Sequence, residues 1–70
     1  MSEPVDIVLA RGRLVREYEA DARERRAAIR DLDASNPVHA RELAHAVTAE
    51  CSAADLRKLI RGELERRAKP

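Results

Sequence analysis

Two histidines and one cysteine are the residues of this sequence whose types could bind a metal ion. His39, His45 and Cys51 follow one another at intervals of six residues. On one helix, six residues rotate the chain by about 240°, so the three side chains point in different directions and cannot converge. Glu42 and His45 form a Glu-x-x-His pair, but di-iron sites of helical bundles need two such pairs and two further carboxylates. We therefore expect no metal site.

Catalytic and cofactor-binding patterns are also missing from the sequence. It contains neither a Gly-rich phosphate loop nor a Gly-x-Ser-x-Gly turn. Cys51 could act as a nucleophile by its type alone, but on a helix the spacing of six positions from His45 separates the two side chains. Short helices also enclose a substrate pocket poorly. The sequence predicts a non-enzymatic protein with no catalytic residue and no cofactor.

The composition predicts a single all-α domain over residues 1–70. Ala, Leu, Arg and Glu, which are strong helix formers, dominate the chain, and Tyr18 is its only aromatic residue. A lone cysteine excludes an internal disulfide and fits the reducing cytoplasm. The longest apolar run, residues 7–10, is too short to span a membrane, so we expect no membrane association. The Ala- and Arg-rich, Lys-poor composition is typical of a GC-rich genome and indicates a bacterial or phage origin.

Periodicity and capping residues predict three helices, at about 4–33, 37–50 and 53–67. Glu3 and Pro4 are typical of a first helical turn. Asn36 is a natural N-cap with Pro37 at the first helical position, and Ser52 can cap a further helix. The first helix carries a heptad-like apolar stripe, and Gly12 leaves open whether that helix is broken. The stripe consists of Val8, Val15, Ala22 and Ile29.

The predicted lengths indicate an unpaired apolar surface. The first helix would be about 45 Å long, and each of the others about 20 Å, so a hairpin of the two short helices covers roughly half of the long one. A soluble protein rarely leaves such a stripe exposed. We therefore predict a homodimer that pairs long helix with long helix. The residues predicted at this dimer or partner interface are Val8, Leu14, Val15 and Tyr18.

Charges on the first helix indicate a solvated surface. Glu19 with Arg23, and Asp21 with Arg25, stand at the i,i+4 spacing that favours ion pairs. The arginines of this region alternate with acidic residues and form no continuous positive face.

The C-terminal segment carries the clearest charge asymmetry, since residues 56–70 hold six basic and two acidic side chains. The stretch from Ala40 to Arg61 has the outline of a helix-turn-helix, in which Arg57, Lys58 and Arg61 would contact DNA. The predicted turn lacks glycine, however, and the net charge of +1 is low for a nucleic-acid binder.

Two functions are therefore open at the level of sequence. The favoured one is a small cytoplasmic protein–protein interaction module (an adaptor, an inhibitor or a regulatory subunit) that acts through an apolar helical stripe. The alternative is a DNA-binding regulator that uses the basic C-terminal helix. No small-molecule cofactor is implied by either.

Overall fold

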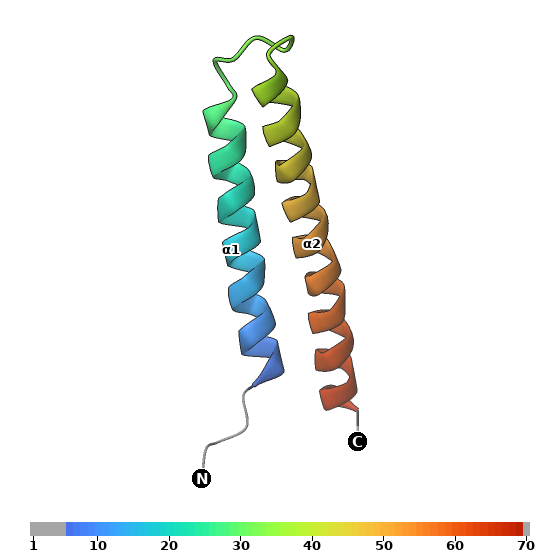
Figure 1. Cartoon of the computed structure of the whole chain (residues 1–70). Helices are drawn as coiled ribbons and strands as arrows, with labels where there is room; N and C mark the ends of the chain where they lie inside the picture. The colour runs from blue at the N-terminus through green and yellow to red at the C-terminus, as the bar shows by residue number, and fades with distance from the viewer. Residues whose placement is uncertain (1–5, 70) are drawn as a thin grey trace.

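The chain forms two antiparallel helices packed side by side. The structure is a computed structural model that describes residues 6–69. Helix α1 spans Ile7–Ala28 and helix α2 spans Pro37–Ala68, and a loop over residues 29–36 joins them at one end of the molecule (Figure 1). The expectation of an all-helical chain is confirmed, and the expected three helices are reduced to two. The predicted helix start at Glu3 and Pro4 lies outside the described residues.

Helix α2 is continuous where the sequence predicted a break at Cys51 and Ser52. Neither glycine nor proline interrupts residues 49–56, and a serine inside a helix costs only about 0.5 kcal/mol relative to alanine. The residues that face α1 also keep one register across the predicted break, at alternating steps of three and four. They are Ala46, Ala49, Ala53, Leu56 and Ile60. A turn at Ser52 would disrupt this continuous seam, so the helix runs through it.

The ends of the helices are set by side-chain caps. Asp6 accepts a hydrogen bond from the Val8 N–H at 2.9 Å, and Asn36 accepts one from the Val38 N–H at 2.9 Å, as the sequence predicted for Asn36. Helix α1 continues through Gly12 and ends at Ala28, five residues before the predicted end near Asp33. The Asp33 carboxylate accepts hydrogen bonds from both the N–H and the hydroxyl of Ser35, which stabilises the turn instead of a further helical turn.

The core is a seam of small and branched side chains between the two helices. Val15, Ala22 and Ile29 recur every seven residues and are buried, which confirms the predicted heptad stripe. Their partners on α2 are alanines: Ala46, Ala49 and Ala53. Small side chains at these positions allow the helices to approach closely. The stripe therefore packs against α2 of the same chain rather than against the first helix of a second copy.

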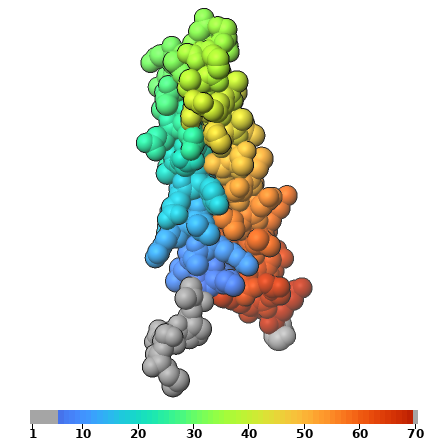
Figure 2. Space-filling view, viewed as in Figure 1, coloured from blue at the N-terminus to red at the C-terminus, as the bar shows by residue number. Residues whose placement is uncertain are grey.

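The molecule is elongated and one layer thick. Its Cα radius of gyration is 16.4 Å, whereas a compact chain of this length has about 11 Å. The Cα extents are 54 × 28 × 13 Å, and the space-filling view shows the same narrow outline (Figure 2). Each broad face of the hairpin is therefore a surface, and no third helix covers either of them within the described residues.

A matched pair of substitutions tests these helix boundaries. We expect Asn36→Ala to lower the free energy of unfolding by about 1 kcal/mol, because it removes the cap of α2. Ser52→Ala should leave stability unchanged or raise it by up to about 0.5 kcal/mol, since Ser52 lies inside a continuous helix. Urea unfolding of both variants checks this. A loss at Ser52 as large as at Asn36 would indicate that a helix begins at Ser52.

Candidate functional site

The four residues predicted at the interface divide between the core and the surface. Val15 is only 5% exposed and packs between the helices, and Val8 is half-buried in the same seam. Leu14 and Tyr18 are exposed, at 42% and 37%. The structure thus leaves Leu14 and Tyr18 available for a partner, while Val15 stabilises the hairpin itself.

Helical rotation assigns the exposed residues to two opposite faces. Each residue turns the helix by about 100°, so Leu14 and Tyr18 fall on one side of buried Val15, and Gly12 and Glu19 fall on the other. On α2, the same rotation from buried Ala53 separates Leu56 and Leu59 from Arg57, Arg61 and Leu64. An ion pair between Glu19 and Arg57 at 2.6 Å joins the two helices on the second side.

The first of these faces carries large apolar side chains from both helices, with the Arg25–Asp21 and Arg67–Glu63 ion pairs on the same side of the molecule, and we call it the Tyr18 face. Because Glu19 pairs with Arg57 and Arg26 pairs with Glu50, Tyr18 lies level with the turn of α2 between Leu56 and Leu59, and Leu14 lies about one turn further toward the C-terminal end of α2. Three of its members are at least 42% exposed. The Tyr18 face consists of Ile7, Leu14 and Tyr18 from α1 and Leu56 and Leu59 from α2.

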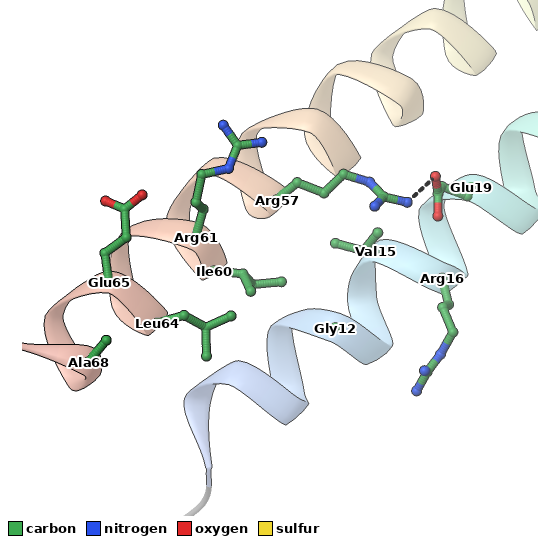
Figure 3. Close-up of a pocket in the computed structure, with 10 residues that line it drawn as sticks. All are labelled: Gly12, Val15, Arg16, Glu19, Arg57, Ile60, Arg61, Leu64, Glu65 and Ala68. Carbon is green, nitrogen blue, oxygen red and sulfur yellow. Dashed lines mark hydrogen bonds and ion pairs between the residues drawn. The ribbon is translucent and has the colours of Figure 1, made fainter.

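The opposite face carries a groove at the end of the hairpin that lies away from the loop over residues 29–36. The groove has a volume of about 650 Å³ and runs between the first half of α1 and the last third of α2. Figure 3 shows Val15, Ile60 and Leu64 at its floor, while the Arg57–Glu19 ion pair crosses between the helices at its inner end. The remaining lining residues are Gly12, Arg16, Arg61, Glu65 and Ala68.

Arginines of α1 form ion pairs with α2 and are not only solvated surface residues. Arg25 bridges Asp21 at 3.0 Å and Glu42 of α2 at 2.7 Å, which confirms the predicted Asp21–Arg25 pair. Glu19 contacts Arg57 and not Arg23, so the second predicted pair is wrong. The reason is that Glu19 lies beside α2, where a cation across the interface is closer than the one on the outer surface.

Several carboxylates are held ionised by these contacts. Arg26 donates two hydrogen bonds to Glu50, at 2.8 and 2.7 Å, and thereby lowers the pKa of that carboxyl below its ordinary value of 4.5. Arg67 likewise lowers the pKa of Asp6, and the Val8 N–H adds to the effect. A hydrogen bond from Arg66 does the same for the pKa of Glu63.

These shifts predict that acid destabilises the hairpin. A group whose pKa is lower in the folded state contributes stability above its unfolded pKa, and that contribution is lost as the pH falls through the folded value. We therefore expect the melting temperature to fall between about pH 5 and pH 3, followed by circular dichroism. Glu50→Gln should lower stability at neutral pH and reduce the loss on acidification, because it removes one of the titrating groups. An equal acid loss in this variant would contradict the role given to Glu50.

The predicted DNA-contacting residues do not stand on a separate recognition helix. Arg57, Lys58 and Arg61 lie within continuous α2, so the turn of the predicted helix-turn-helix is wrong. Arg57 is already paired with Glu19, whereas Lys58 and Arg61 are exposed. The pattern that suggested a helix-turn-helix arises from one amphipathic helix with a charged outer side.

Neither the two histidines nor the cysteine belongs to the Tyr18 face or lines the groove. His45 and Cys51 are exposed and His39 is half-buried. Within residues 6–69, no three His, Cys, Asp or Glu side chains are grouped in a way that could hold a metal ion. In the same part of the chain, neither helix combines the length and apolar character that crossing a membrane requires.

Sequence reasoning missed the part of each face that α2 supplies. Leu56, Leu59, Ile60 and Leu64 share one apolar side of α2, and the position of α1 against that side divides them between the Tyr18 face, the seam and the groove. The continuous spacing of Ala46, Ala49 and Ala53 is the feature of the sequence that could have indicated a single helix here.

Comparison of the chain with protein-family models, with curated proteins and with solved structures finds no match. The two faces of the hairpin are therefore the features that indicate a function.

Proposed function

We propose that this chain is a homodimeric, non-enzymatic protein–protein interaction module that acts through the Tyr18 face. The single observation that carries the proposal is the exposure of large apolar side chains on that face. Leu14, Tyr18 and Leu59 are 42%, 37% and 52% exposed, and the hairpin is only one layer thick. Exposed apolar patches rimmed by polar residues mark interaction sites in soluble proteins.

The small core supports the same proposal. Four of the six buried side chains in the described residues are alanines, and the other two are Val15 and Ile29. A chain of this length buries only about 60% of its unfolded surface even when compact, and a single hairpin buries less. Isolated helical pairs of this size are marginal without reinforcement, and a second subunit supplies it when no disulfide is present.

The position of the Tyr18 face suits a symmetric dimer. Tyr18 lies at the middle of α1, so a twofold axis near it would overlap two hairpins along most of their length. A face of 54 × 28 Å is large enough for the roughly 800 Å² per partner that a stable interface buries. The resulting four-helix assembly would place Leu14, Tyr18, Leu56 and Leu59 in a shared core. An adaptor, inhibitor or regulatory subunit is the class of protein that this arrangement fits.

Co-purification of two differently tagged copies tests the proposal. Copies refolded together should purify as a mixed dimer through either tag, and the same preparation should give no gel shift of random-sequence duplex DNA at low salt. Even non-specific DNA binders reach about 10⁻⁴ to 10⁻⁶ M at physiological salt, so a DNA-binding protein would be detected. If purification through one tag recovered only the copy that carries it, or if the duplex were clearly shifted, the proposal would be contradicted.

A further inference from the structure

The groove on the face opposite to the Tyr18 face remains open when two hairpins pair. Its lining residues Gly12 and Leu64 lie on the other side of their helices from Leu14 and Leu59. Leu64 is 50% exposed and Leu9, close to the groove on α1, is 72% exposed. One dimer contact therefore covers one apolar face and leaves a second.

The shape of the groove fits a helix. Its floor is apolar, and small residues stand at its edges, Gly12 on α1 and Ala68 on α2. A Cβ placed on Gly12 would meet no atom within 4 Å, so a neighbouring helix could approach the α1 backbone closely there. The lined part of α1, from Gly12 to Glu19, is about 10 Å long, which corresponds to two turns of a helix laid along it.

The charges around the groove define the partner more closely. Arg57 is neutralised by Glu19, which leaves Arg16 and Arg61 against the single carboxylate of Glu65. Among the described residues, neither Arg16 nor Arg61 takes part in an ion pair, and Figure 3 shows them on opposite walls, pointing away from the floor. An apolar floor with a cationic rim is complementary to an apolar helix with acidic flanks.

From these features we propose that the groove binds an acidic amphipathic helix of a partner protein. Apolar side chains of that helix at i, i+3 or i+4, and i+7 would contact Val15, Ile60 and Leu64. Its acidic flanks would pair with Arg16 on one side and Arg61 on the other. The groove site lies on a different face from the dimer contact, so it goes beyond the function proposed above and does not depend on it.

Binding of two synthetic peptides to the full chain tests this site. Both are fluorescent helical peptides of about four turns with the same leucine stripe, and one has glutamates beside the stripe where the other has lysines. We expect the glutamate peptide to bind at least about tenfold more tightly by fluorescence anisotropy, with an affinity that falls as salt rises. Equal binding of the two peptides, or no binding of either at about 100 µM, would overturn the proposal.

Glycine variants locate the binding. Gly12→Leu should fill the groove and lower the affinity for the glutamate peptide at least about tenfold, while Gly62→Leu should leave that affinity unchanged. The two are matched, because a Cβ on either glycine meets no atom within 4 Å and only Gly12 lines the groove. Circular dichroism establishes that both variants fold. Equal weakening by both variants would place the peptide elsewhere.

Charge-reversal variants and measurements of self-association distinguish the acidic helix from two other possible occupants of the groove, a second copy of the chain and nucleic acid. Arg16→Glu with Arg61→Glu should transfer the preference to the lysine peptide, whereas Lys58→Glu, which changes an exposed cation outside the groove, should keep it. The Gly12→Leu chain should remain as associated as the wild type. Loss of self-association in Gly12→Leu would assign the groove to a second copy, and a gel shift of duplex DNA lost with the two arginines would assign it to nucleic acid. Either result would overturn the proposal.

Discussion

Replacing Ala46 by leucine is expected to destabilise the hairpin by about 1–3 kcal/mol. Ala46 is fully buried, with no exposed surface, and it forms the centre of the core with Ala22 and Ala49. A leucine there has three more carbon atoms than the site accommodates, so the helices must separate or the side chain must leave its preferred rotamer. Urea unfolding at one fixed protein concentration measures the change.

Ala54→Leu provides the matched control, because Ala54 lies on the same helix and is exposed. Both leucine and alanine favour helix, so this variant should change the free energy of unfolding by less than about 0.5 kcal/mol. If Ala46→Leu were as stable as Ala54→Leu, the close alanine contact between α1 and α2 would be absent from the folded protein.

Leu14→Asp is expected to dissociate the homodimer, raising its dissociation constant by about thirtyfold or more. Burying a leucine contributes about 1.5–3 kcal/mol, and the aspartate would also place a charge against Tyr18, Leu56 and Leu59 of a second copy. The milder Leu14→Ala should act in the same direction with less effect on folding. Light scattering during size-exclusion chromatography reports the mass of each variant.

Leu9→Asp is the control for this substitution. Leu9 is more exposed than Leu14, at 72% against 42%, but it lies on the opposite side of α1. This variant should associate as the wild type does. Equal dissociation by Leu9→Asp and Leu14→Asp would show that the Tyr18 face is not the specific contact.

The local features of the fold could be predicted from the sequence, but the number of helices could not. The cap at Asn36 and the buried positions Val15, Ala22 and Ile29 follow from residue type and spacing. The break predicted at Ser52 failed because a capping residue only permits a helix to start. The continuous packing of Ala46, Ala49 and Ala53 against α1 outweighs that local preference, and packing of this kind depends on the other helix.

The candidate surfaces were predictable only in part, for the same reason. Leu14 and Tyr18 were identified as unpaired because they are apolar on a long helix, and both are exposed in the structure. Val15 could not be separated from them until the position of α2 was known. The groove was not predictable, since it forms where Gly12 of one helix lies beside Leu64 of the other, 52 positions along the chain.

Sedimentation equilibrium over a wide range of protein concentration tests the homodimer most directly. The mass should rise from that of the chain, 7.9 kDa, to twice that value as concentration increases. The melting temperature should rise over the same range, because association favours the folded state by mass action. A well-folded species that keeps a mass of 7.9 kDa at every concentration, with a constant melting temperature, would contradict the homodimer and its use of the Tyr18 face.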